Sequence, residues 1–371
     1  MNILQIITGL DYGGAETLLL DICKELKDRG HNISVIYLKS EGQLEVEFKN
    51  YNLEVKKVNI EKKNPLSVIY TICDFILKNE IDIVHTHLIH ADIYGRISAL
   101  LAGVDKIFTT LHATNNWRKE TNLKAGIAKF FDKNLLNRLQ SSSAIAISKA
   151  VKDFFVQYES LAPKKISVIP NAIKVDKKMS SKQITRDDLG VARDDFLIVN
   201  VGRLEEAKGQ IYLLKAVHYL INELQINSLK CIIIGEGSQY RYLKEYLSEN
   251  DLEEHIFMLG AKSNVYDYLK LANIFVMPSL WEGFGISILE AYLNELPVLA
   301  TKVDGIVEVV KDPETGILVD SKDERLLAAE IMRFYEGAYD LERMAAQGKK
   351  RLAENYTIDS YINQLLQLYN S

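Results

Sequence analysis

Short apolar runs alternate with longer stretches of helical periodicity through the first half of the chain. The runs have the length of buried strands, and they cover residues 3–7, 33–38, 83–85, 106–111, 144–147 and 166–169. Helical spacing of apolar residues is clearest over residues 15–28 and 65–78. Strands that alternate with helices in this way predict a parallel sheet covered by helices on both faces.

The alternation stops at a polar, charged stretch over residues 172–195 and then begins again. Further strands are predicted at residues 196–201, 231–235, 256–259, 274–277, 298–300 and 317–319. The fold class is therefore α/β, with two Rossmann-like, doubly wound parallel-sheet domains facing each other across a cleft that would hold the active site. The expected domains are residues 1–175 and 196–355, with a linker at 176–195 and a C-terminal helix at 356–371 that packs back across the junction.

Composition narrows the class of protein. The chain has 371 residues, which favours two domains, and 47% hydrophobic with 26% charged residues is ordinary for a globular protein. A net charge of -5 argues against nucleic acid as a partner. Cys23, Cys73 and Cys231 are scattered in apolar segments, which favours reduced thiols. With no leader peptide pattern and no apolar run of membrane-spanning length, we expect a cytoplasmic protein.

Residues 276–291 carry the strongest chemical signal. An apolar strand runs into Pro278, and a glycine loop then leads to a helix that opens at Ile286. Main-chain N–H groups at a helix N-terminus attract phosphate. Two carboxylates, Glu282 in the loop and Glu290 in the helix, are suited to accept hydrogen bonds from sugar or ribose hydroxyls.

Two cations follow the predicted strand at residues 196–201. Arg203 offers a bidentate fork and Lys208 a mobile charge, which suits a diphosphate that gains negative charge as it leaves. Glu236 lies between two glycines after the next strand, where a base or ribose could approach closely, although such a triplet usually marks only a turn.

The first half holds weaker candidates. Gly13 and Gly14 separate the first strand from the first helix, without the full Gly-x-Gly-x-x-Gly pattern of dinucleotide binding. His85 and His87 share a strand face, but no carboxylate or thiolate partner supports a metal site. His112, at another strand end, is the better candidate to touch a substrate hydroxyl.

Residues 117–139 combine six basic side chains with aromatic and leucine side chains. This pattern predicts either a helix with a solvated basic face or a surface that lies on an anionic membrane. The second alternative would place the protein at the inner face of the plasma membrane, next to a lipid-linked acceptor.

Together these motifs resemble the retaining glycosyltransferases of family 4, which have the GT-B fold. The resemblance spans nearly the whole chain, and it is most specific in the second half. Asn171 resembles the family's hinge asparagine, although Ala172 stands where glycine is common. The resemblance implies a nucleoside-diphosphate-sugar donor, with UDP favoured, and a saccharide or lipid-linked saccharide acceptor in surface polysaccharide or glycolipid assembly.

The resemblance also implies roles for particular residues. Arg203, Lys208, Glu282 and His112 form the catalytic set, with Arg203 and Lys208 on the diphosphate and His112 on the donor sugar. The donor-binding set is Gly13, Gly14, Arg203, Lys208, Glu236, Lys262, Gly283, Phe284, Gly285, Ile286 and Glu290. No cofactor and no metal are expected, because the cations and the helix terminus stabilise the leaving diphosphate, and no Asp-x-Asp follows an apolar strand.

Two alternatives remain open from the sequence. A sugar-nucleotide 2-epimerase of the same architecture would bind the same donor and turn over without an acceptor. A non-catalytic sugar-nucleotide-binding subunit would have the same fold, with the charged side chains directed away from the ligand.

Overall fold

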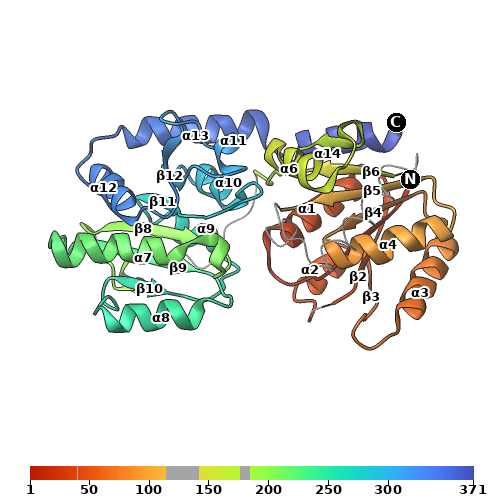
Figure 1. The fold of residues 1–371 in the computed structure, drawn as a ribbon, viewed down its shortest axis with the longest axis horizontal. Helices are drawn as coiled ribbons and strands as arrows, with labels where there is room; N and C mark the ends of the chain where they lie inside the picture. The colour runs from red at the N-terminus through yellow and green to blue at the C-terminus, as the bar shows by residue number, and fades with distance from the viewer. Residues whose placement is uncertain (40, 114–141, 176–183) are drawn as a thin grey trace. The chain divides into compact units, whose positions relative to one another are not determined.

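The computed structural model describes residues 1–39, 41–113, 142–175 and 184–371. The chain forms two compact units. The first comprises Met1–Lys174 and Ile358–Ser371, and the second comprises Val175–Thr357. Each unit is built around one parallel sheet (Figure 1).

The first unit contains a seven-stranded parallel sheet of order β3-β2-β1-β4-β5-β6-β7. Its strands are β1 (Asn2–Ile7), β2 (Asn32–Tyr37), β3 (Glu54–Lys57), β4 (Ile83–His87), β5 (Lys106–Leu111), β6 (Ser142–Ala146) and β7 (Ile166–Val168). Its described helices are α1 (Gly14–Asp28), α2 (Glu45–Asn50), α3 (Pro65–Lys78), α4 (Ile89–Leu101), α6 (Lys149–Glu159) and α14 (Ile358–Asn370).

Alternate residues of β1 face opposite sides of this sheet. Leu4 and Ile6 enter an apolar core with residues of α3 and α4, including Val68 and Ala91. Gln5 points to the other side, where α14 packs against α1. The C-terminal helix thus covers the face of the first sheet to which Gln5 and His85 point, since Tyr369 contacts both side chains.

The second unit contains a six-stranded parallel sheet of order β10-β9-β8-β11-β12-β13. Its strands are β8 (Phe196–Val201), β9 (Leu229–Ile234), β10 (Ile256–Met258), β11 (Ile274–Met277), β12 (Val298–Thr301) and β13 (Gly316–Val319). Its helices are α7 (Gln210–His218), α8 (Tyr240–Glu249), α9 (Val265–Leu269), α10 (Ile286–Leu293), α11 (Ile306–Val309), α12 (Glu324–Tyr335) and α13 (Leu341–Asn355).

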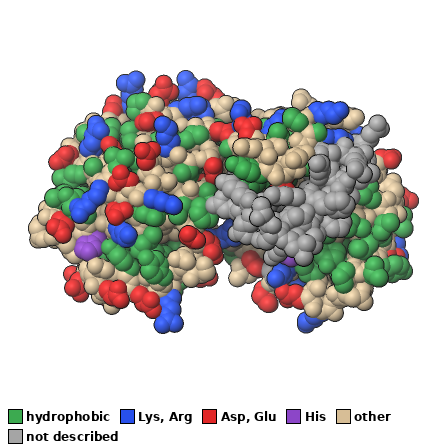
Figure 2. Space-filling view, in the orientation of Figure 1, with side chains coloured by type: hydrophobic (Ala, Val, Ile, Leu, Met, Phe, Trp, Pro, Cys, Tyr) green, Lys and Arg blue, Asp and Glu red, His purple; other side chains and the backbone are tan. Residues whose placement is uncertain are grey.

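The predicted fold class, two parallel-sheet α/β domains in series, is confirmed. The end of the connecting segment is attached to the second unit, because the Arg186 guanidinium donates to the carbonyl oxygens of Leu271 and Asp195 at 2.8 Å each. The three cysteines are free, as expected. Among the described residues visible in Figure 2, acidic and basic side chains are interspersed.

Candidate functional site

The loop after β8 carries the two predicted cations. The strand is tied to β11 by Asn200, whose buried Nδ2 donates to the carbonyl of Val276 at 2.8 Å. Arg203 follows with an exposed side chain. A single 3-10 turn, Glu206–Lys208, then returns the chain toward the sheet, and the Lys208 side chain keeps only 22% exposure.

The loop after β9 packs so closely on the β8 loop that it requires glycine. Gly235 has φ +148, and a Cβ there would lie 1.9 Å from the carbonyl oxygen of Gly202. Leu204 N donates to the carbonyl of Glu236 at 2.8 Å, which joins the two loops. This packing leaves the Glu236 side chain exposed at the carboxyl edge of the sheet.

The third loop runs from β11 to α10. Gly285 has φ +92 and forms the N-cap of α10, and no side chain caps this terminus. A Cβ on Gly209 would lie 2.2 Å from the carbonyl oxygen of Pro278. The main chain of the loop after β8 therefore packs directly on the main chain of the loop after β11. The N-terminus of α10 therefore supplies main-chain N–H donors and the positive end of the helix dipole close to the loop after β8, which carries Arg203 and Lys208.

Lys208 and Glu282 form an ion pair between these two loops. Both side chains are largely buried, with 22% and 13% exposure. Glu282 is held from a fourth loop as well, because its main-chain N–H donates to Asp304 Oδ2 at 3.3 Å and its carbonyl accepts from Gly305 N at 3.0 Å. The carboxylate therefore orients the lysine at the carboxyl edge of the sheet.

Three further donor-site candidates of the second unit differ in how exposed they are. Glu290 is half-buried, one turn into α10. Lys262 is exposed beyond β10, next to Ala261, whose N–H donates to Glu236 Oε1 at 3.4 Å. Phe284 is buried at 2% exposure with its ring 5.5 Å from that of Tyr356, so its side chain packs in the core of the second unit.

The structure thus gathers most of the predicted set within the second unit. The residues at the carboxyl ends of β8, β9, β10 and β11 are Arg203, Lys208, Glu236, Lys262, Glu282, Gly283, Phe284, Gly285, Ile286 and Glu290. The arrangement places cations, main-chain N–H groups and hydroxyl-accepting carboxylates at one edge, which is chemically suited to a sugar diphosphate.

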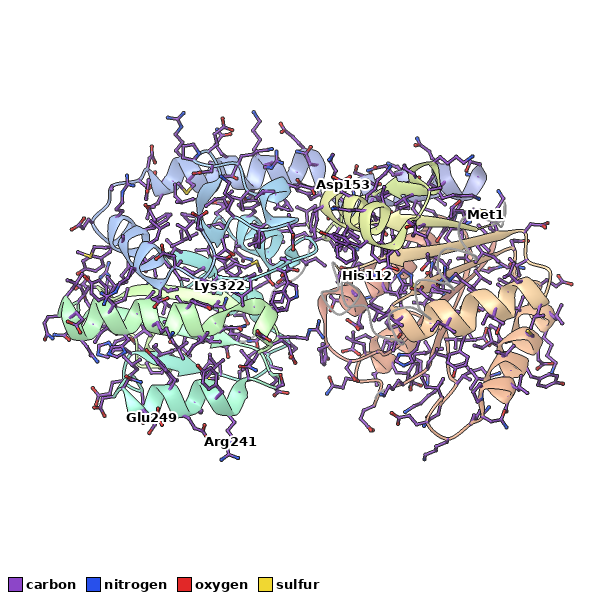
Figure 3. The ribbon with its side chains drawn as sticks, in the orientation of Figure 1. Met1, His112, Asp153, Arg241, Glu249 and Lys322 are labelled. Atoms are coloured by element: carbon purple, nitrogen blue, oxygen red, sulfur yellow. The ribbon has the colours of Figure 1, made fainter. Side chains whose placement is uncertain are left out.

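The other three candidates belong to the first unit. Gly13 is the N-cap of α1, and its Cα faces the Glu16 carboxylate, since a Cβ on Gly13 would lie 2.4 Å from Glu16 Oε2. Gly14 begins the helix. His112 follows β5 (Figure 3), and its Nε2 lies 3.2 Å from His87 Nδ1.

Three functional positions escaped the sequence reasoning. Gly209 and Gly305 allow the close approach of the loops, since a Cβ on Gly305 would lie 2.1 Å from the Gly283 carbonyl oxygen. Gly209 lies in the loop after the predicted strand 196–201, and Gly305 lies in the loop after the predicted strand 298–300, so a glycine in the loop after a strand was the available signal. Gln5, which supports the histidines, is the one polar side chain within the apolar run 3–7.

The remaining expectations concern the basic segment at residues 117–139, metal binding, membrane-spanning helices and Asn171. Residues 117–139 lie outside the described residues. Within the described ranges, no group of three or more His, Cys, Asp or Glu side chains is arranged to hold a metal ion. No helix among the described residues is long and apolar enough to cross a membrane. Asn171 is buried after β7, and its Oδ1 has no hydrogen-bond partner among the described residues.

Comparison with known proteins assigns both halves of the chain to glycosyltransferase families. Residues 12–177 match the model of Glycosyltransferase Family 4, and residues 181–351 match Glycosyl transferases group 1. The chain is 28% identical to the UDP-Gal:alpha-D-GlcNAc-diphosphoundecaprenol alpha-1,3-galactosyltransferase of Escherichia coli, over 84% of this chain and 81% of the relative. It is 24% identical to the capsular polysaccharide biosynthesis glycosyltransferase CapM of Staphylococcus aureus, over 92% and 91% of the two chains.

Solved structures show the same fold. HepE from Anabaena, in complex with UDP and glucose, superposes with a TM-score of 0.87 at 23% identity over 100% of both chains. Its complex with UDP-glucose gives a TM-score of 0.87 at 23% identity, over 99% of this chain and 98% of that one. From the two family matches and the paired parallel-sheet architecture, the chain belongs to the family 4 glycosyltransferases of the GT-B fold.

Proposed function

We propose that this glycosyltransferase moves a hexose or N-acetylhexosamine from a UDP-sugar to a hydroxyl of a saccharide or lipid-linked saccharide acceptor, with retention of the anomeric configuration and without a metal. The observation that carries the proposal is the convergence of Arg203, Lys208, Glu282 and the uncapped N-terminus of α10 at one edge of the second sheet. The product would enter a surface polysaccharide or glycolipid.

In this proposal the donor is held by complementary charges and hydrogen bonds. The Arg203 fork and the Lys208 ammonium bind the diphosphate, together with main-chain N–H groups of Gly283–Ile286. The Glu290 carboxylate accepts hydrogen bonds from the ribose hydroxyls, and Glu282 orients Lys208 while it faces the donor sugar.

The chemical step breaks the bond between the anomeric carbon and the diphosphate oxygen, and the electron pair leaves with UDP. Positive charge develops on the sugar, and negative charge grows on the diphosphate, where the two cations and the helix terminus stabilise it. The acceptor oxygen then bonds to the anomeric carbon from the face that UDP leaves. Its proton passes to an oxygen of the departing diphosphate, so charge and atoms balance without a covalent enzyme intermediate.

Two similarities support UDP and a lipid-linked acceptor. HepE was solved with UDP and with UDP-glucose, and the name of the E. coli relative specifies UDP-Gal and a diphosphoundecaprenol acceptor. An acceptor of that kind would bring the enzyme to the cytoplasmic face of the plasma membrane.

The test is a transfer assay in EDTA with UDP-Gal, UDP-Glc and UDP-GlcNAc against a panel of saccharide and lipid-diphosphate-saccharide acceptors. We expect one UDP-sugar to yield an α-linked product, read from the anomeric proton coupling in the NMR spectrum. A β-linked product would refute retention, and activity only after addition of a divalent cation would refute metal independence. Conversion of the donor to its 2-epimer without an acceptor would instead identify an epimerase.

A further inference from the structure

A continuous chain of hydrogen bonds, buried except for its part-buried last link, runs from the C-terminal helix to His112. Tyr369 of α14 places its hydroxyl 2.6 Å from His85 Nδ1 and 3.4 Å from Gln5 Nε2. Gln5 Oε1 lies 2.9 Å from His87 Nε2, and His87 Nδ1 lies 3.2 Å from His112 Nε2. All five side chains belong to the first unit, and they lie on the face of its sheet that α14 covers.

These histidines are held neutral by their surroundings. Burial, followed by the neighbouring histidine charge, lowers the pKa of His85 to about 3. The same causes lower the pKa of His87 well below its ordinary value, and burial lowers the pKa of His112 to about 4. A neutral imidazole carries one proton, so each ring has one donor nitrogen and one acceptor nitrogen.

The position of each proton follows from the orientation of Gln5. Its Oε1 can only accept, so His87 Nε2 carries the proton and His87 Nδ1 is left as the acceptor. His112 Nε2 must then donate to His87 Nδ1, which leaves the lone pair of His112 on Nδ1.

Tyr369 fixes the orientation of Gln5 from the other side. The Gln5 amide nitrogen donates to the Tyr369 hydroxyl, and that hydroxyl donates its own proton to His85 Nδ1. His85 in turn donates from Nε2 to Thr110 Oγ1 at 2.7 Å. Each hydrogen bond between these side chains then has one donor and one acceptor.

We propose that Gln5 and His87, oriented by Tyr369, form a positioning relay that keeps the proton of His112 on Nε2 and leaves its Nδ1 lone pair as the acceptor for a substrate hydroxyl. This inference rests on the proposed function, to which it adds that His112 contacts a substrate hydroxyl. It also sets a specificity: the substrate must offer a hydroxyl that donates to Nδ1.

The test locates the ring proton of His112 by NMR. The full-length protein is labelled with ¹⁵N-histidine, and long-range ¹H–¹⁵N spectra are recorded at neutral pH without donor. A spectrum of His112→Gln assigns the signals of that residue. We expect an unprotonated nitrogen at Nδ1 of His112 and a protonated nitrogen at Nε2. A proton on Nδ1 in the wild type would overturn the proposal.

Substitutions test whether the relay sets this tautomer. Gln5→Met keeps the side-chain length and removes the hydrogen bonds, so a second His112 tautomer should become populated. Tyr369→Phe should act in the same direction, and it carries the test if Gln5→Met does not fold. Tyr37→Phe is the matched control, since this buried tyrosine of the first unit hydrogen-bonds Glu45 and none of the side chains of the relay. An unchanged His112 tautomer in both relay variants would refute the relay.

A second readout separates this inference from the proposed function. Gln5→Met should lower kcat for sugar transfer roughly 3- to 10-fold, as expected for one neutral hydrogen bond, and leave the Kd for UDP unchanged. The predicted tautomer without any sugar transfer would refute the function and leave the proton assignment intact. Transfer by a protein with the opposite tautomer would refute only the relay.

Discussion

Lys208→Met isolates the charge that we place on the leaving diphosphate. The substitution keeps most of the apolar stem and removes the ammonium that pairs with Glu282. The two side chains are 22% and 13% exposed at the edge of the sheet. The pair is largely buried, so the substitution leaves the Glu282 carboxylate without its cation, and we expect a loss of stability of about 1–3 kcal/mol, which is a fall of several degrees in the melting temperature.

The expected effect on catalysis is measured separately from this loss of stability. Loss of one donor that stabilises charge in the transition state typically lowers kcat by about 10²–10³, which corresponds to roughly 3–4 kcal/mol. Transfer from the UDP-sugar and thermal unfolding would be measured on the same preparations. Lys244→Met is the matched control, because it removes a more exposed ion pair with Glu253 in the same unit. Its melting temperature and kcat should both stay close to wild type.

A double substitution distinguishes a catalytic cation from a structural pair. If Lys208 served only to neutralise Glu282, then Lys208→Met with Glu282→Gln would restore activity toward the wild-type value. The proposed roles require the double variant to be at least as inactive as the poorer single variant. Recovery of activity in the double variant, or a kcat of Lys208→Met within about threefold of wild type, would refute the reasoning.

Three further predictions concern other positions. Glu290→Gln should raise the KM for the UDP-sugar about tenfold with unchanged thermal unfolding, because an amide accepts hydrogen bonds from the ribose hydroxyls less strongly than a carboxylate does. Equal KM values in the variant and the wild type would contradict the proposed role of Glu290. Gly235→Ala should destabilise the protein by about 1–3 kcal/mol more than Gly337→Ala in urea unfolding. The first Cβ would meet a main-chain oxygen at 1.9 Å, whereas the second, also at positive φ, would meet nothing within 4 Å. The free energy of unfolding should decrease as the pH falls from about 6.5 to about 4, because the unfolded state binds a proton at His112 that the folded state excludes. His112→Gln should reduce this slope by up to about 1.4 kcal/mol per pH unit, and an unchanged slope would contradict the lowered pKa of His112 in the folded protein.

The strands and helices with strong apolar periodicity were predictable from the sequence. The predicted helix at residues 65–78 and the strands at 106–111, 196–201 and 274–277 have the observed bounds. β3, Glu54–Lys57, was not predicted, because it is an edge strand whose side chains remain partly or fully exposed.

α4, Ile89–Leu101, escaped prediction for a different reason. Its buried face contains polar residues, so the apolar spacing is broken. Asp92 accepts from the Thr86 hydroxyl at 2.7 Å, and Gly95 packs where a Cβ would lie 2.6 Å from Thr86 Cγ2. A helix face satisfied by tertiary hydrogen bonds has no periodic signal of its own.

The candidate site was predictable as a set of residue types at strand ends, but its contacts were not. Lys208 and Glu282 are 74 positions apart, and their pairing depends on how closely two loops pack. The support of His112 by Gln5, His87 and Tyr369 likewise joins three elements of the first unit. Such contacts depend on tertiary packing, which local patterns do not encode.

The most direct test of the account is a thermal-shift series with UDP, GDP and ADP in EDTA, applied to the wild type and to Arg203→Ala. A ligand present at 100 times its Kd stabilises the folded state by about 2.7 kcal/mol, which is a shift of several degrees. The account predicts stabilisation of the wild type by UDP above the other nucleotides, with most of that shift lost in Arg203→Ala. A flat response of the wild type to all three nucleotides would contradict a metal-independent UDP-sugar site at the carboxyl edge of the second sheet.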